Sequence, residues 1–212
     1  MQKIWAIAFI GLTAVSGFLG YQYLTEQQEL STAVVYPNAR NLTEFQVMDH
    51  RGNPVGREQL LGQWTLAFVG YTFCPDICPM TLATLSGAVP KLQQMLPAGQ
   101  KLAIWFISVD PARDTQSQLQ TYVGYFEQKA LTGVTAKHEQ LFPFVRDLGL
   151  SYAISSSSEP DYRVDHSASI VLINPMGQLA AVFKPELSSN TVPVVTQQQL
   201  LRDFPVILSQ IN

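Results

Sequence analysis

The chain contains two cysteines, Cys74 and Cys78, and both lie in the short run Phe-Cys-Pro-Asp-Ile-Cys-Pro. An apolar stretch typical of a buried strand precedes them, and Pro79 then marks the start of a predicted helix. The free N–H groups at a helix N-terminus stabilise a thiolate and lower its pKa. We therefore expect both sulfurs to be reactive, and not to serve as two small buried hydrophobic side chains.

A Cys-x₃-Cys pair alone is compatible with a metal site or with a redox-active dithiol, so the presence of a third ligand matters. Of the three histidines, His50 lies in a predicted turn and is interpreted as solvated, and His138 stands at a predicted helix start and is interpreted as exposed. His166 leads into the last predicted hairpin. In a thioredoxin-like order of elements, the leading end of that hairpin passes beside the first helix, which makes His166 the histidine placed to reach the cysteines.

Two thiolates and one imidazole suit copper(I), a soft ion that accepts three ligands, whereas structural zinc usually takes a fourth protein ligand. Copper(II) would need a further donor, such as water, Asp76 or Asp165, and the sequence does not choose between them. Met80 and Met95 fall within a helical pattern, so we interpret them as core residues and not as copper ligands.

The elements that must position these residues follow from the hydrophobic pattern. Residues 45–57 predict a β-hairpin, and buried strands are expected over 64–71, 101–109, 169–173 and 179–183. Four helices are expected. The first begins at Pro79 and has a kink or an end at Pro90, and the second follows Asp114 or Thr115 as its N-cap. The third covers residues 141–148, and the fourth begins at about Gln197. This order predicts an α/β, thioredoxin-like fold: a mixed sheet with helices on both faces, an N-terminal β-hairpin extension and the closing hairpin as an antiparallel edge.

An uncharged stretch covers residues 4–24. As a helix with a rise of about 1.5 Å per residue, it is long enough to cross a bilayer core of about 30 Å. Lys3 precedes the stretch and Glu26 and Glu29 follow it, so the positive flank is N-terminal. We expect a single transmembrane helix in a bacterial inner membrane, with the rest of the chain in the periplasm; a cleaved signal peptide is the alternative.

The composition sets the remaining limits. With 47% hydrophobic and 14% charged residues, the chain is not a disordered one, and its net charge of −3 argues against a nucleic-acid partner. Two cysteines exclude a disulfide-dense scaffold. The predicted organisation is a membrane anchor over residues 1–24, a polar linker over 25–44 and one domain over 45–212.

Three motifs together resemble those of the Sco/SenC family: Phe-Val-Gly-Tyr-Thr-Phe-Cys-Pro-Asp-Ile-Cys-Pro at 68–79, Ser-Val-Asp-Pro-Ala-Arg-Asp at 108–114 and Val-Asp-His-Ser at 164–167. Ala112 departs from the charged residue that family members often carry there. The resemblance implies a membrane-tethered, thioredoxin-like protein that binds one copper through Cys74, Cys78 and His166. It also implies a role in assembling the CuA centre of cytochrome c oxidase, with the CuA-bearing subunit or its assembly factors as partner.

An enzyme is the main alternative: a thiol–disulfide oxidoreductase that reduces the cysteines of a copper-site target. Such a catalyst would not need His166, and its usual spacing is Cys-x₂-Cys. A peroxiredoxin-like activity is a weaker third option, because the two cysteines lie close together for separate peroxidatic and resolving roles. Chaperone and reductase functions can coexist, because a Cys74–Cys78 disulfide cannot bind copper as two thiolates.

Two further segments have competing interpretations. The segment from Asp110 to Asp114 is interpreted as structural, with Arg113 and Asp114 capping and charge-pairing at the next helix; docking of a partner is the alternative. The serine-rich loop over 155–161 leads into the strand that carries His166. We expect it either to let His166 swing away during copper release or to be an inert surface loop.

Overall fold

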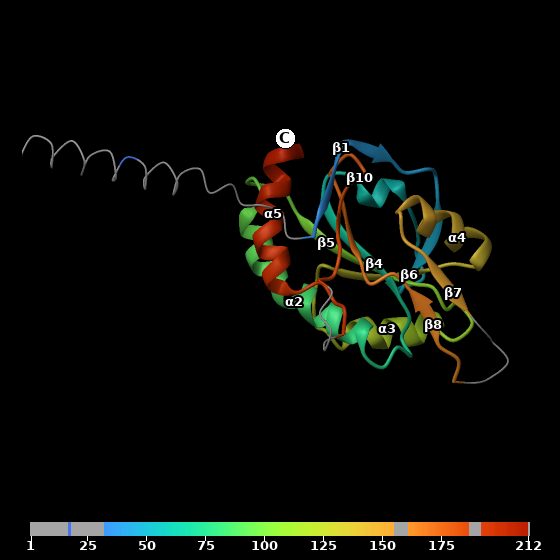
Figure 1. Ribbon diagram of the computed structural model, residues 1–212. Coiled ribbons are helices and arrows are strands. Elements are labelled where there is room, and N and C mark those ends of the chain that lie inside the picture. The colour runs from blue at the N-terminus through green and yellow to red at the C-terminus, as the bar shows by residue number, and fades with distance from the viewer. Residues whose placement is uncertain (1–16, 18–31, 155–160, 187–191, 212) are drawn as a thin grey trace, which may run out of the picture.

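An eight-stranded mixed sheet forms the centre of the computed structural model, which describes residue 17 and residues 32–154, 161–186 and 192–211. The strand order is β1-β10-β9-β4-β5-β6-β2-β3 (Figure 1). The bounds are β1 Val34–Asn41, β2 Gln46–Asp49, β3 Pro54–Gly56, β4 Trp64–Gly70, β5 Leu102–Ser108, β6 Leu131–Thr135, β9 Ile170–Ile173 and β10 Gln178–Phe183. Strands β4, β5 and β6 are parallel and the other neighbours are antiparallel, which confirms the predicted mixed α/β sheet.

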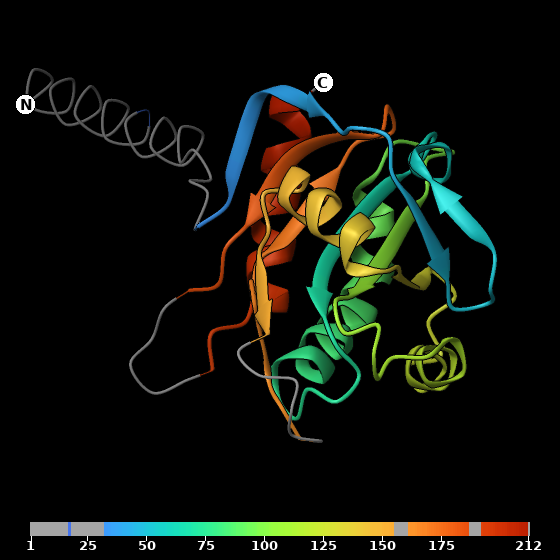
Figure 2. The same ribbon diagram turned by 90° about the vertical axis from the view of Figure 1, so that its right-hand side faces the viewer.

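Helices cover both faces of this sheet, as predicted. On one face lie α2 (Ile77–Met95), α3 (Gln116–Gly124) and α5 (Gln197–Ile211); on the other lie α4 (His138–Asp147) and the short 3₁₀ helix η1 (Arg57–Leu60) (Figure 1). Figure 2 shows α4 in front of the sheet. Because they are covered on both sides, β4 and β5 are buried at every position, which explains their unbroken apolar sequence.

Helix details differ from the expectation at several positions. Helix α2 continues past Pro90, so the chain does not leave the helix there. Thr115 is the N-cap of α3, and its side chain accepts a hydrogen bond from the N–H of Gln118. Met80 and Met95 are 45% and 38% exposed, so their interpretation as core residues is wrong. The buried face of α2 is formed instead by Cys78, Thr81, Leu82, Leu85, Ala88 and Leu92.

The expected linker over 25–44 contains a strand of the sheet. Strand β1 pairs with β10, so β10 is not the sheet edge that the closing hairpin was predicted to form. Pro37 and several polar residues make this stretch look like a tether, but both are common in an edge strand, which has one unpaired side. The linker prediction is therefore wrong for residues 34–41.

A second, two-stranded sheet pairs β7 (Tyr152–Ile154) with β8 (Val164–His166). The serine-rich residues 155–160 between these strands lie outside the described part of the chain. The expected membrane span over 4–24 does so as well, apart from Gly17. None of the helices that the structure describes is long and apolar enough to cross a bilayer.

Candidate metal centre

Cys74, Cys78 and His166 come together in space, although 88 positions separate the second cysteine from the histidine. Cys74 lies in the loop after β4, Cys78 lies in the first turn of α2, and His166 ends β8. One potential ligand atom from each residue lies within 4.8 Å of the other two. The distance from Cys78 Sγ to His166 Nε2 is 3.4 Å. The three residues chosen from the sequence therefore form one cluster.

The imidazole of His166 has a defined orientation. Its Nδ1 is 3.1 Å from the carbonyl oxygen of Ser167, and because a carbonyl can only accept, Nδ1 carries the proton of this hydrogen bond. In the neutral imidazole the lone pair is then on Nε2, the nitrogen that lies 3.4 Å from the sulfur of Cys78. The ring of Tyr71 packs edge-on against the imidazole, with 6.0 Å between ring centres. His166 is thus presented in the form in which histidine binds a metal.

The two sulfurs have unequal surroundings. Cys78 is fully buried, whereas Cys74 is partly exposed. The Cys78 thiol donates a hydrogen bond to the Cys74 sulfur, and mainly for this reason the pKa of Cys74 falls to about 3. The same hydrogen bond, together with burial, raises the pKa of Cys78. The two shifts have opposite signs, so Cys74 is the sulfur of the pair that ionises first.

A pocket of about 190 Å³ opens beside the cluster. Its lining comprises Tyr71, Cys74, Pro75, Asp76, Ile77, Arg163, Val164, Asp165 and His166. Cys74 and His166 thus border the opening, whereas the buried Cys78 is not part of its lining. Asp76 and Asp165 also line the pocket, but among the described residues the group of potential ligand atoms within 4.8 Å consists of the two cysteines and the histidine.

Asp114 supports the cysteine loop, a role that the sequence analysis missed. Its carboxylate accepts hydrogen bonds from the backbone N–H of Thr72 at 2.9 Å, from the Thr72 hydroxyl at 2.7 Å and from the Ser108 hydroxyl at 2.6 Å. Burial raises the pKa of Asp114, while these hydrogen bonds favour the ionised form. Asp114 thereby fixes the backbone two residues before Cys74 instead of capping α3. The expected contacts of the 110–114 segment therefore differ from those observed: Asp114 binds Thr72, 42 positions away, and Arg113 pairs with Asp110.

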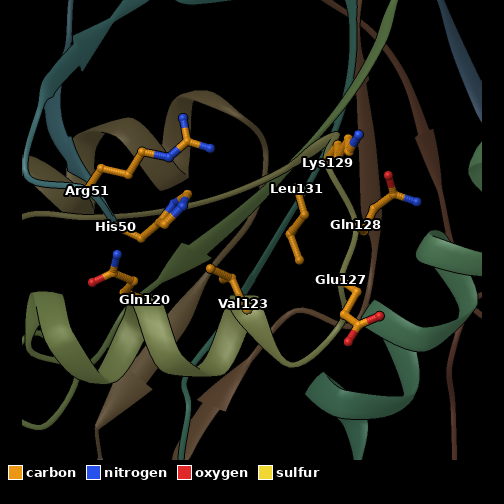
Figure 3. A pocket seen from close by; sticks show the side chains of 9 residues that line it. His50, Arg51, Gln120, Val123, Glu127, Gln128, Lys129 and Leu131 are labelled. Carbon is orange, nitrogen blue, oxygen red and sulfur yellow. The ribbon is translucent and has the colours of Figure 1, made fainter.

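Of the other two histidines, one differs from its interpretation. His50 is buried rather than solvated; its Nδ1 accepts a hydrogen bond from the N–H of Gly133, and burial lowers its pKa. Together with Arg51, Gln120 and Lys129, His50 lines a pocket of about 310 Å³ (Figure 3). This pocket shares no lining residue with the cysteine pocket. His138 is exposed, as expected, and its Nδ1 lies 2.9 Å from the hydroxyl of Tyr152.

Comparison with known proteins identifies the family. The sequence profile described as SCO1/SenC matches residues 35–200. A protein of Stutzerimonas stutzeri that carries the name of a copper-binding protein is 34% identical over 172 residues, which make up 80% of this chain and 82% of that protein. The mitochondrial SCO2 homolog of Mus musculus is 36% identical over 177 residues, which cover 78% of this chain and 68% of that protein.

A solved structure supports the same assignment. The structure of Arabidopsis thaliana ScoI with copper bound matches this fold with a TM-score of 0.67 and 30% sequence identity, over 80% of this chain and 98% of that chain. The region that the family profile matches, residues 35–200, contains both cysteines and His166. The chain therefore belongs to the SCO1/SenC family, as its three motifs indicate.

Proposed function

We propose that this protein is a copper chaperone that binds one copper(I) ion through Cys74, Cys78 and His166 and passes it to the CuA centre of cytochrome c oxidase. The observation that carries the proposal is the convergence of two sulfurs and one imidazole nitrogen beside an open pocket. This donor set suits a soft, three-coordinate ion. Family membership and the copper-bound Arabidopsis relative support the choice of metal, and the family resemblance supports the choice of acceptor.

The layout of the site suggests how copper leaves. Cys74 and His166 border the pocket, so an incoming thiolate or imidazole of the acceptor meets these two ligands first. Cys78 is buried and is not part of the pocket lining, so it is the last of the three to be reached. Stepwise exchange of ligands would keep the ion coordinated throughout, with Cys78 releasing it last.

The binding proposal is tested by anaerobic titration of the reduced full chain with copper(I) in competition with a chelator. We expect saturation at one equivalent. His166→Ala should weaken binding, and Cys74→Ser or Cys78→Ser should weaken it more, because a thiolate is the stronger donor for a soft cation. His138→Ala is the matched control, since His138 is an exposed histidine outside the cluster. Binding by His166→Ala as tight as that of the parent would refute the three-ligand site.

A second function, thiol–disulfide exchange, is favoured by the inequality of the two cysteines. The partly exposed Cys74 thiolate would attack a disulfide of the target, form a mixed disulfide and release one target thiolate. Cys78 would then lose its proton and attack Cys74, which releases the second target thiol. The products are a reduced target and a Cys74–Cys78 disulfide, so two electrons pass to the target.

This reductase function predicts that Cys78→Ser accumulates a mixed disulfide between Cys74 and its target, because the second attack is removed. Cys74→Ser, which lacks the attacking sulfur, is the control and should trap nothing. Failure of Cys78→Ser to trap any target under conditions in which the parent reduces it would exclude the mechanism.

We also propose that residues 4–24 anchor the protein in a bacterial inner membrane and leave the copper site in the periplasm. The uncharged stretch and its positive N-terminal flank support this orientation. In intact spheroplasts, an added protease should digest the domain. In a separate sample without protease, the protein should stay in the membrane fraction after a carbonate wash. Release by carbonate, or full protection from the protease, would contradict the anchor or its orientation.

A further inference from the structure

His166 is carried by a short arm, residues 161–167, that is separate from the main sheet. The strand of this arm, β8, pairs with β7 in the two-stranded sheet and is not a member of the eight-stranded one. The cysteines, in contrast, follow directly from β4 in the middle of the main sheet. The distance between His166 and the sulfurs is therefore set by the start of β9, which pairs with β4, and by the side-chain contacts that join the arm to the cysteine loop.

A buried carboxylate makes the first of these contacts. The side chain of Asp110, two residues after β5, is fully buried, and one of its oxygens accepts a hydrogen bond from the hydroxyl of Tyr162 in the arm. Its other oxygen accepts a hydrogen bond from Nε of Arg113 at 2.5 Å. The guanidinium carbon of Arg113 in turn lies 3.6 Å from the centre of the Tyr162 ring. Tyr162 is thus held at its hydroxyl by Asp110 and across its face by Arg113.

The same guanidinium also contacts the cysteine loop. Its carbon lies 5.5 Å from the ring centre of Tyr71 and 5.1 Å from that of Phe73, the residue before Cys74. Tyr71 packs edge-on against the imidazole of His166. Arg113 therefore stands between aromatic residues of the arm and aromatic residues of the loop.

We propose that Asp110, Arg113 and Tyr162 form a clamp that positions His166 against Cys74 and Cys78 in the metal-free protein. They are positioning residues, because they act through the arm and the loop. The inference rests on the proposed copper site and adds the residues that set its geometry. An arm already in place loses less conformational entropy on binding, so the clamp should raise copper affinity through His166.

A double-mutant cycle tests this coupling. Tyr162→Phe removes the hydroxyl bonded to Asp110 but keeps the ring under Arg113, and Arg113→Lys keeps the charge but loses the planar stack. Each should weaken copper(I) binding by the full chain about 10-fold to 100-fold, the usual effect of residues that orient metal ligands. In a His166→Ala background the same substitutions should leave the affinity unchanged. Equal losses in both backgrounds would mean a general effect on the fold and would overturn the proposal.

Tyr125→Phe is the matched control, because Tyr125 is 84% exposed and its loss of a hydroxyl should change neither affinity nor exchange. Hydrogen exchange of residues 161–167 in the reduced, metal-free full chain provides a readout that needs no copper. Tyr162→Phe should speed exchange there, and unchanged exchange would overturn the clamp. If the parent binds no copper at all, the proposed function fails, but the exchange result still decides whether the clamp exists.

Discussion

Cys74 and Cys78 share one motif but differ in protonation. The hydrogen bond from Cys78 lowers the pKa of Cys74 to about 3 from an ordinary value of 9.0. Because the folded pKa is the lower one, ionised Cys74 contributes stability to the reduced protein that is fully present above about pH 9 and is lost progressively as the pH falls toward 3. Copper binding should have the same sign and weaken in acid, because the bound thiolates must give up their protons.

We predict that Cys74 in the reduced, metal-free protein remains reactive in mild acid. The rate of its alkylation by iodoacetamide should change little between about pH 8 and about pH 5, whereas an ordinary thiol slows about tenfold per pH unit. Peptide mapping by mass spectrometry distinguishes the two cysteines. Cys78→Ala removes the donor and should restore a steep dependence on pH. A tenfold fall per unit in the parent would show that the two sulfurs do not share a proton in this way.

At the scale of elements, the site depends on how closely α2 approaches the end of β4. Gly70 is the last residue of β4, and a Cβ added there would lie 2.5 Å from Cys78 Sγ and 2.8 Å from the Phe106 ring. The sequence signal for this contact is a glycine at the end of an apolar strand, which often marks a close approach of another group.

Gly70→Ala should therefore displace Cys78, lower the free energy of unfolding by about 1–3 kcal/mol and weaken copper(I) binding. Denaturant unfolding of the reduced, metal-free protein and chelator competition measure the two effects. Gly87→Ala is the control: Gly87 lies in α2 with no neighbour within 4 Å of an added Cβ, so alanine should stabilise the helix by about 0.5–1 kcal/mol. Wild-type stability and affinity in Gly70→Ala would show that the close approach is unimportant.

At the scale of the whole molecule, the proposed copper ligands connect the loop after β4 with an arm outside the main sheet. A ligand that binds only the folded state stabilises it, by about 2.7 kcal/mol at a free concentration of 100 times its dissociation constant. The cysteines form no disulfide in this structure, and such binding needs both of them reduced. A Cys74–Cys78 disulfide would remove both thiolates, so the redox state should control copper occupancy.

We predict that copper(I) raises the unfolding temperature of the reduced protein and leaves that of the oxidised protein unchanged. Oxidised protein should bind negligible copper in the titration and regain one equivalent after reduction. Cys74→Ser, which cannot form the disulfide, should respond weakly to copper and identically before and after oxidant treatment. Equal copper binding by oxidised and reduced parent would refute redox control.

The sequence by itself determined the buried strands β4, β5, β9 and β10, the two hairpins and the residues of the candidate site, but neither β1 nor β6. The buried strands around β4 and β5 are unbroken apolar runs, and the spacing of Cys74 and Cys78 before a helix is a local chemical pattern. His166 could be selected as the third ligand because it leads into the last predicted hairpin. In a thioredoxin-like order of elements, that end of the hairpin lies beside the first helix. These features can be read because burial and helix starts leave a signal in neighbouring residues.

Only the tertiary structure decided the features that depend on residues far apart in the chain. Strand β1 has no buried residue and contains Pro37 and several polar residues, so its sequence resembles a linker, and only its pairing with β10 shows it to be a strand. The burial of His50, the bond from Thr72 to Asp114 and the contacts of Arg113 with Tyr162 each join segments more than 40 positions apart. Such contacts leave no periodic signal, because a side chain's partner is set by how the sheet and its helices pack and not by its neighbours in sequence.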